Sequence, residues 1–427
     1  MKHNIPVQDY GQLASEMADA VSQCVHCGFC LPACPTYNLL HQEMDSPRGR
    51  IILMKSVLER EIDLEEAVPY IDHCLGCLAC QTVCPSGVQY GNLLTPFKAY
   101  SETVRRRPAE ERFSRWVTKE TLPKPARFRL ATQVAKISKP FASIAPTRFQ
   151  AMLDLVPEDI PGAERLPSTF PAQGKRQAKV ALQVGCVQQV LAQKINLATL
   201  RVLSKNGIEV VIPSAQGCCG ALALHTGDMD TAFNLASNNL DNFPKDVDAI
   251  ISNAAGCGSA MHEYPQLFKG SKYEELASLF AEKVIDISVF LTEIDLEPIP
   301  PLENQLKIAY HDACHLSHAQ GVTREPRELL GKVPNLSLLP INEEDLCCGS
   351  AGSYNLEQPV IAQQLGQRKI HNILDVEPEI IVTGNIGCLI QLQNHLNQKL
   401  QNTDEPQLNP PVMHTIELID QAYRNEL

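Results

Sequence analysis

Sixteen cysteines are the residues most able to do chemistry in this chain of 427 residues. The first eight form two identical C-x2-C-x2-C-x3-C-P motifs that repeat after 50 residues. Three thiolates from one loop and a fourth from elsewhere suit an iron-sulfur cubane, and in two-cluster ferredoxins the fourth cysteine of each motif ligates the other cluster. We therefore expect one [4Fe-4S] cluster on Cys24, Cys27, Cys30 and Cys84, and a second on Cys74, Cys77, Cys80 and Cys34.

Zinc is the alternative occupant of these motifs, but zinc sites favour paired C-x2-C units, which this spacing does not provide. Arg48 and Arg50 lie between the two motifs. If these arginines lie near an anionic cluster, their positive charge would raise the reduction potential of the cluster. The alternative is that they belong to a solvated helix end and have no role at the cluster. His26 and His73 adjoin predicted ligands, and we interpret them as neighbouring or exposed residues because all four ligand places are filled.

The other eight cysteines belong to a second duplication. Each copy has a single cysteine after an apolar run, a Cys-Cys-Gly motif, and a Gly-Cys that follows another apolar run. The offsets between equivalent cysteines are 128, 129 and 131 residues, which indicates two homologous domains. These cysteines are Cys186, Cys218, Cys219 and Cys257 in the first copy, and Cys314, Cys347, Cys348 and Cys388 in the second.

Three uses of these thiols stay open: a metal or cluster site, a reactive dithiol, and small buried side chains at strand ends. Metal or cluster binding is the favoured interpretation, since eight cysteines in register are too many for packing alone. Four histidines lie near the motifs, and each is interpreted as a surface or satisfied core residue: His225, His311, His315 and His318.

Short apolar runs that alternate with helical stretches in each copy predict a parallel α/β sheet, with the cysteines at the carboxyl ends of its strands. The fold class is therefore α+β and α/β multidomain: a mostly helical two-cluster ferredoxin domain and two duplicated α/β Cys-Cys-Gly domains with parallel sheets. The predicted boundaries are 1–100 for the ferredoxin domain, 101–175 for a basic, proline-rich connector with short helices, 176–300 and 301–427 for the two Cys-Cys-Gly domains.

The connector has a charge unlike that of the whole chain. Residues 98–150 carry 13 Lys and Arg against four Glu, although the chain has a net charge of -12. Arg105, Arg106 and Arg107 are followed by Phe113, Trp116 and Phe128, a mixture that suits an anionic membrane surface, an acidic face of a partner subunit, or an ordinary solvated face.

Composition excludes several classes of function. The acidic balance argues against a nucleic acid partner. No apolar run long enough to span a membrane and no signal peptide are evident, so we expect a cytoplasmic protein, with peripheral attachment to the inner face of the membrane as an alternative. No flavin, nicotinamide or nucleotide motif is present, and we assign no catalytic residue. A chain with relay clusters and no organic redox cofactor is expected to conduct electrons for a partner.

Several sequence words together resemble the iron-sulfur subunit of bacterial glycolate oxidase, and the resemblance covers nearly the whole chain. These words are CVHCGFCLPACPTY at 24–37, DSPRGRI at 45–51, CLGCLACQTVCPSG at 74–87, QGCCGAL at 216–222, CCGSAGSYNLEQP at 347–359 and GNIGC at 384–388. The resemblance implies a complex whose flavin subunits oxidise glycolate to glyoxylate, while this chain passes electrons toward the membrane quinone pool or another acceptor. The eight ferredoxin cysteines of that family correspond to the eight named above.

The same modules occur in heterodisulfide reductases, in lactate-utilisation proteins and in anaerobic glycerol-3-phosphate dehydrogenases. In heterodisulfide reductases the Cys-Cys-Gly domains end in C-x2-C, whereas here Cys257 and Cys388 have no such partner. This absence of a fifth thiol weakens the alternative of a disulfide reductase. The iron-sulfur subunit of another 2-hydroxy acid or glycerol-3-phosphate dehydrogenase and a zinc-held interaction protein are the remaining alternatives.

Overall fold

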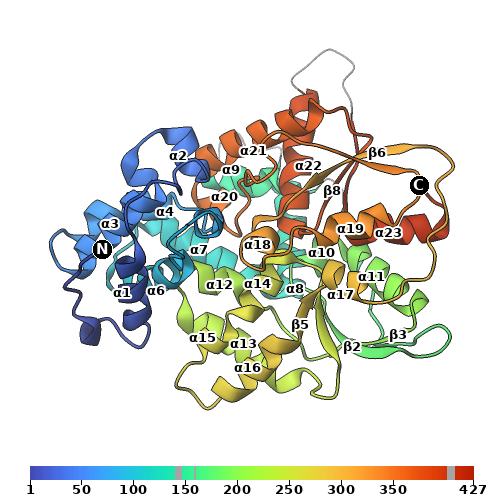
Figure 1. Ribbon diagram of the computed structural model, residues 1–427, viewed down its shortest axis with the longest axis horizontal. Helices are drawn as coiled ribbons and strands as arrows, with labels where there is room; N and C mark the ends of the chain where they lie inside the picture. Colours follow the sequence, from blue (N-terminus) through green and yellow to red (C-terminus); the bar gives the residue numbers. More distant parts are fainter. Residues whose placement is uncertain (140–146, 158–159, 402–408) are drawn as a thin grey trace.

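The computed structural model describes residues 1–139, 147–157, 160–401 and 409–427. Its N-terminal region is helical, as the sequence predicts, and lies at one end of the molecule (Figure 1). Its elements are the 3-10 helices η1 (Val7–Asp9) and η2 (Glu43–Asp45), and the helices α1 (Ala14–Gln23), α2 (Pro35–Leu40), α3 (Pro47–Leu58), α4 (Leu64–Asp72), α5 (Ala79–Thr82) and α6 (Tyr90–Val104).

Local sequence explains where the two helices between the cysteine motifs begin. Ser46 caps α3, because its hydroxyl accepts a hydrogen bond from the Gly49 N–H at 2.9 Å, and Pro47 occupies the first helical position. Asp63 and Glu66 form a capping box at the start of α4. Both helices bury one apolar face in the core of the N-terminal region, which places the two cysteine loops side by side.

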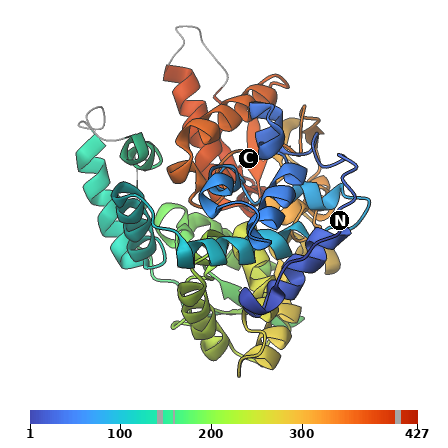
Figure 2. The same ribbon diagram turned by 90° about the vertical axis from the view of Figure 1, so that its left-hand side faces the viewer.

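Three helices form the connector, together with loops that are described only in part because 140–146 and 158–159 lie outside the described residues. They are α7 (Ala109–Thr121), α8 (Pro125–Ser138) and α9 (Thr147–Asp154). Helix α7 contacts both later domains through ion pairs, Arg115 with Glu357 at 2.9 Å and Lys119 with Asp228 at 2.5 Å. The connector therefore lies against the rest of the molecule, as Figure 2 also shows.

The first Cys-Cys-Gly domain contains a five-stranded sheet with the order β1-β3-β2-β4-β5. Its strands pair in parallel, as predicted, except that β1, within the predicted connector, adds an antiparallel edge. The elements are β1 (Thr169–Phe170), β2 (Ala178–Gln183), α10 (Gln188–Leu191), α11 (Gln193–Lys205), β3 (Ile208–Val211), α12 (Ala221–Thr226), α13 (Met229–Asn242), β4 (Ala249–Ser252), α14 (Ala255–His262), α15 (Tyr264–Leu267), α16 (Glu274–Lys283), β5 (Val284–Asp286) and α17 (Ile287–Glu293).

The second Cys-Cys-Gly domain contains a four-stranded parallel sheet with the order β7-β6-β8-β9. Its elements are β6 (Leu306–His311), α18 (Cys314–Ser317), α19 (Glu325–Gly331), β7 (Leu336–Leu339), α20 (Tyr354–Glu357), α21 (Pro359–Leu374), β8 (Ile380–Thr383), α22 (Ile386–Gln401), β9 (Val412–His414) and α23 (Thr415–Arg424). Both parallel sheets and the helical N-terminal region confirm the predicted fold class.

The two Cys-Cys-Gly domains pack against each other through equivalent elements. The last helix of the second domain, α23, packs on α11 of the first, and the last helix of the first domain, α17, packs on α19 of the second. One hydrophobic core includes Ile251 and Leu291 from the first domain together with Val382 and Ile419 from the second. The two sheets are therefore held in a fixed relation, with the carboxyl ends of their central strands facing a shared space.

Candidate iron-sulfur and thiol sites

The first ferredoxin motif contributes three cysteines to a small cavity. Cys24, Cys27 and Cys30 line it together with Cys84 from the second motif, and Cys80 also reaches its wall. Cys24 is buried, Cys30 and Cys84 are partly buried, and Cys27 is exposed. The structure thus brings together the four thiols that the motif exchange predicts for one cluster.

The second ferredoxin motif gathers around Cys34. The Cys77 and Cys80 thiols are crowded by Cys34 and Cys74, and burial followed by these neighbours raises the pKa of Cys80 well above its usual range. Crowded, buried thiols give up their protons when a metal cation supplies compensating positive charge. The four thiols predicted for the second cluster therefore also lie together, in surroundings that suit a bound metal.

Arg50 is an almost fully buried cation beside this second group. Its side chain is 1% exposed, and Nη1 lies 3.7 Å from the Cys34 sulfur. Nη2 donates to Thr36 at 2.9 Å and Nε to the Tyr70 carbonyl at 2.7 Å, which fixes the guanidinium in place. Arg48 instead lines the cavity of the first group, where it pairs with Glu43 and donates to the His26 carbonyl at 3.1 Å.

The first Cys-Cys-Gly site brings its four cysteines together. The Cys186 and Cys218 sulfurs are 3.4 Å apart, and Cys219 interacts with both Cys218 and Cys257. Hydrogen bonds from Cys186, Cys219 and the Gly220 N–H lower the pKa of the buried Cys218 thiol below its usual range. This thiol is therefore prepared to act as an anionic ligand or nucleophile.

The glycine of each motif is required by the backbone. Gly220 and Gly349 have φ angles of +85° and +83°, in the left-handed region that side chains disfavour. A Cβ on Gly349 would lie 2.7 Å from the Ala362 carbonyl oxygen, and one on Gly220 would lie 3.3 Å from that of Ala232. Glycine thus lets the two adjacent cysteines turn toward their site while the loop packs closely on α13 or α21.

The second Cys-Cys-Gly site repeats this arrangement. The Cys314 and Cys347 sulfurs are 3.9 Å apart, and Cys348 and Cys388 lie together beside the ring of His311. A hydrogen bond from Cys348, with further contributions from His311 and from Asn385 at 3.4 Å, lowers the pKa of Cys388 to about 5 despite its burial. His311 is thus part of the site, contrary to its interpretation as a surface or satisfied core residue.

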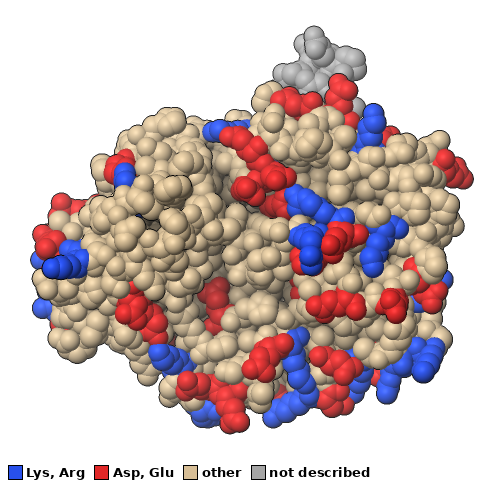
Figure 3. Space-filling view, viewed as in Figure 1, with Lys and Arg blue, Asp and Glu red and all other residues tan. Residues whose placement is uncertain are grey.

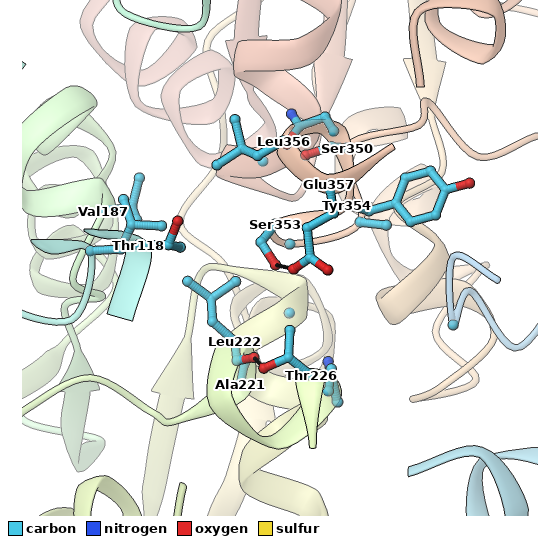
Figure 4. A pocket seen from close by; sticks show the side chains of 18 of the residues that line it. Thr118, Val187, Ala221, Leu222, Thr226, Ser350, Ser353, Tyr354, Leu356 and Glu357 are labelled. Carbon is cyan, nitrogen blue, oxygen red and sulfur yellow. Dashed lines mark hydrogen bonds between the residues drawn. The ribbon is translucent and has the colours of Figure 1, made fainter. Parts of the chain in front are cut away.

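Both Cys-Cys-Gly sites open on one cavity of about 1150 Å³, lined by all eight of their cysteines. Figure 4 shows side chains from three parts of the chain around it, among them Thr118 of α7, Leu222 of α12 and Ser353 beside α20. We call this cavity the thiol chamber. Sequence reasoning predicted two separate sites and missed both the shared chamber and the contribution of α7, α8 and α9 to its wall.

Two histidines and a glutamate stand in the same chamber. The rings of His225 and His315 are 5.2 Å apart, and the His225 Nε2 is 3.0 Å from a carboxylate oxygen of Glu263. Burial, with His225 nearby, lowers the pKa of His315 to about 4, so this ring is neutral at physiological pH. His318 lies outside the chamber lining and contacts the Thr82 hydroxyl at 3.0 Å.

The second ferredoxin group adjoins the second Cys-Cys-Gly site. Cys77 packs against Cys314 and Cys347 in one apolar cluster, and Cys74 reaches the wall of the thiol chamber. Tyr354 beside this cluster donates a hydrogen bond to the His73 carbonyl at 2.8 Å. The cysteines of the N-terminal region and of the second domain therefore form a contiguous series.

Comparison with known proteins agrees with this geometry. Residues 20–88 match the 4Fe-4S dicluster domain, and residues 180–262 and 308–393 match the cysteine-rich domain. The glycolate oxidase iron-sulfur subunit of Escherichia coli is 37% identical over 97% of this chain and 97% of its own length. The chain belongs to the family of glycolate oxidase iron-sulfur subunits. This confirms the family resemblance and the expectation of [4Fe-4S] clusters in an oxidoreductase subunit.

Other relatives of the glycolate oxidase iron-sulfur subunit family extend the comparison. The probable glycolate oxidase iron-sulfur subunit of Bacillus subtilis is 36% identical over 87% of this chain and 88% of its own length. Lactate utilization protein A of Bacillus velezensis is 28% identical over 57% of this chain and 99% of its own length. A solved structure of a hypothetical protein from Helicobacter pylori has a TM-score of 0.42 at 10% identity, covering 87% of this chain and 76% of that one.

The structure also bears on membrane contact. Among the described residues, no helix combines the length and apolar character needed to cross a bilayer. Arg105 pairs with Asp72 at 2.6 Å and Arg107 pairs with Glu102 and Glu111, so both side chains are occupied by carboxylates, while Arg106 is exposed. On the face in Figure 3, acidic and basic side chains are interspersed.

Proposed function

We propose that this chain relays electrons from a flavin-containing subunit, which oxidises glycolate to glyoxylate, toward the membrane quinone pool. The observation that carries the proposal is the contiguous series of cysteines from the exposed Cys27, through the group around Cys34 and Cys77, to Cys347 beside the thiol chamber. The names of the E. coli and B. subtilis relatives support glycolate as the substrate of the complex.

In this proposal two [4Fe-4S] clusters are held by the thiols that the structure gathers. Cys24, Cys27, Cys30 and Cys84 hold the first, and Cys34, Cys74, Cys77 and Cys80 hold the second. When bound, such clusters accept and release single electrons. Arg50 stabilises negative charge on the second group because its Nη1 lies 3.7 Å from the Cys34 sulfur, and its ion pair with the buried Asp45 at 3.2 Å offsets part of this effect.

The donor subunit is proposed to dock around Cys27. Val25 and Phe29, on either side of this exposed cysteine, are 64% and 67% exposed, which gives a flavoprotein an apolar surface next to the first cluster. The proposed acceptor end is the thiol chamber. Leu130 and Val134 of α8 line it and are also exposed to solvent, so an apolar quinone has a path to the thiols.

Peripheral contact with the inner face of the cytoplasmic membrane is part of the proposal. Since Arg105 and Arg107 are held in ion pairs, the contact is assigned to the exposed apolar residues Phe113, Trp116 and Ile137 on α7 and α8, aided by Arg106. Cosedimentation of the assembled complex with anionic liposomes tests this assignment. A Trp116→Ser, Ile137→Ser double variant should bind less, and a matched Leu279→Ser variant, on exposed α16, should bind as the native chain does. Equal binding of all three would contradict it.

The Cys-Cys-Gly thiols are proposed to hold metal, four in each domain. A disulfide reductase remains the second candidate function, because Cys218 has a lowered pKa in a chamber large enough for a substrate. Turnover of a disulfide by this chain, lost in Cys218→Ser and Cys347→Ser, would favour the reductase. Iron above the amount of about eight atoms per chain that two cubanes account for would favour metal sites.

The relay is tested with the full chain purified without oxygen. With its flavoprotein partners, glycolate should reduce the chain, and cluster absorbance should bleach; alone, the chain should show no glycolate-dependent change. Cys77→Ser should block transfer to a quinone while Val7→Ser, at an exposed N-terminal residue, should not. Bleaching of the isolated chain by glycolate, or undiminished quinone reduction by Cys77→Ser, would contradict the proposal.

A further inference from the structure

The second Cys-Cys-Gly site contains a buried imidazole with no conventional hydrogen-bond partner. His311 is 1% exposed at the end of β6, and among the described residues its ring nitrogens have no nitrogen or oxygen partner, only the neighbouring Cys388 thiol. One ring nitrogen and the sulfurs of Cys348 and Cys388 all lie within 4.8 Å of one another. A buried imidazole whose polar neighbours are thiols lacks the strong hydrogen bonds that such a group usually makes, which points to a ligand that the ring and the thiols contact together.

The first domain has a different side chain at the equivalent position. Strands β2 and β6 align residue by residue, which places Gln183 where the second domain has His311. The Gln183 amide donates to the Gly217 carbonyl at 3.0 Å and so helps to hold the loop before Cys218. His311 makes no such bond, because its ring faces the thiols instead of the loop.

We propose that His311 is a metal ligand of the second Cys-Cys-Gly site, so that this site offers four thiolates and one imidazole while the first offers thiolates alone. This inference rests on one part of the proposed function, namely that the Cys-Cys-Gly thiols of the second domain hold metal. Imidazole and thiolate together are donors that iron accepts in proteins. Both domains lack the C-x2-C pair, and His311 supplies a fifth donor in the second domain.

A second histidine near the site has different surroundings. The His315 Nδ1 lies 3.5 Å from the Cys314 sulfur, but its ring packs against that of His225 and lies near Glu263 in the thiol chamber. His315 therefore contacts only one thiol of the group, whereas His311 lies between two. This makes His315→Gln the matched control for His311→Gln.

A neutral fifth donor leaves the charge of the four thiolates unchanged. Imidazole is neutral, so a metal centre held by four thiolates and His311 carries one negative charge fewer than a centre held by five thiolates would carry. In Rieske centres, histidine ligation raises the reduction potential in this way. We therefore expect His311→Cys, which adds a fifth thiolate, to lower the reduction potential of the second site.

The test uses the full chain, loaded anaerobically with iron and sulfide and labelled with 15N-histidine. Pulsed EPR should detect a histidine nitrogen coupled to a reduced metal signal in the native chain and in His315→Gln, and should lose it in His311→Gln. Glutamine is the residue that the first domain has at this position. The His311→Cys variant keeps a metal donor in case His311→Gln fails to fold. His311→Cys should retain iron and should lack the nitrogen coupling.

The possible failures are distinguishable. Iron that stops at about eight atoms per chain would show that the Cys-Cys-Gly sites bind none, and both the proposed metal sites and the role of His311 would fall. Additional iron without histidine coupling in the native chain, or with coupling that persists in His311→Gln or His311→Cys, would overturn the role of His311 alone.

Discussion

The two Cys-Cys-Gly domains share one backbone plan but differ in charge at equivalent buried positions. Each domain places four cysteines in the loops and helix starts that follow the same three strands, with glycine in the same left-handed conformation. Around this frame, three neutral or acidic side chains of the first domain are replaced by basic side chains in the second. The pairs are Gln183 and His311, Asn239 and Lys369, and Asp286 and His414.

The second of these pairs shows how one task is done by two kinds of side chain. Asn239 accepts a hydrogen bond from the Gly217 N–H at 2.8 Å and donates to the Cys218 carbonyl at 3.2 Å. Lys369 donates to the carbonyls of Glu343 and Glu344, each at 2.8 Å. Both residues hold the loop before the Cys-Cys-Gly motif, but only Lys369 adds a cation behind the thiols. The duplication therefore preserved geometry and changed the electrostatic surroundings of the site.

Removal of Lys369 should give the largest effect on stability. Lys369→Met deletes two charge-assisted hydrogen bonds from a buried site, which we expect to cost about 4 kcal/mol, against about 2 kcal/mol for Asn239→Leu with its neutral bonds. Denaturant unfolding of the chain, followed by circular dichroism, measures both losses. The exposed Lys332→Met should change little. A smaller loss for Lys369→Met than for Asn239→Leu would remove charge as the difference between the domains.

The third pair predicts opposite pH dependences. Burial raises the pKa of Asp286 to about 6, so the folded state retains a proton that the unfolded state loses, and stability falls as pH rises from about 4 to 6. Burial lowers the pKa of His414 to about 4, so the unfolded state binds the extra proton, and stability falls as pH drops from about 6.5 to 4.

These two contributions oppose each other, each by about 3 kcal/mol, so the native chain should show a shallow pH dependence between pH 4 and 6 from this pair. Asp286→Asn should steepen the loss of stability toward acid, and His414→Asn should steepen the loss toward neutral pH. Both substitutions keep a residue that caps a helix. Unfolding midpoints measured at half-unit intervals of pH provide the test, and parallel curves for both variants would contradict the assignment.

The smallest expected effect concerns the last helix of each Cys-Cys-Gly domain, which packs against the other domain. Helix α23 is tied to α11 by Arg201, which donates to both carboxylate oxygens of Asp420 at 2.6–3.1 Å, whereas α17 meets α19 through apolar residues. Since Arg201 is partly exposed, Arg201→Ala should cost about 1 kcal/mol and less at high salt. Unfolding in 0.05 and 0.5 M NaCl compares the two conditions. If the loss of stability in Arg201→Ala were the same at both salt concentrations, the contribution of Arg201 would come from packing and not from its charge.

Much of the ligand chemistry follows from local spacing. The exchange of Cys34 and Cys84 between motifs is a prediction from spacing, because a short loop supplies only three ligands to one cluster; Cys84 lines the cavity of the first motif, and Cys34 lies near Cys77 and Cys80. The duplication was predictable from cysteine offsets, and the parallel sheets from short apolar strands that alternate with helices. These features depend on residues near one another in the sequence or on exact repetition.

What sequence reasoning missed depends on how distant elements pack. The thiol chamber exists because α17 and α23 hold the two domains together and because α7 to α9 close one side, and no local pattern encodes these contacts. His311 was set aside because a lone histidine beside a motif is usually a core or surface residue. Alignment of the two repeats could have indicated a special role for His311. It stands three residues before Cys314, where the first repeat has Gln183 before Cys186.

The shared core has a consequence for the order in which the protein matures. Arg201 and Asp420 are separated by 219 positions, and the apolar face of α11 stays uncovered until α23 has been synthesised. Domains commonly fold as soon as they leave the ribosome, but here the first domain cannot complete its own core before the second exists. The nascent chain therefore carries the exposed apolar face of α11 until the end of translation, whereas the N-terminal region, whose core lies between Ile5 and Phe97, is complete long before.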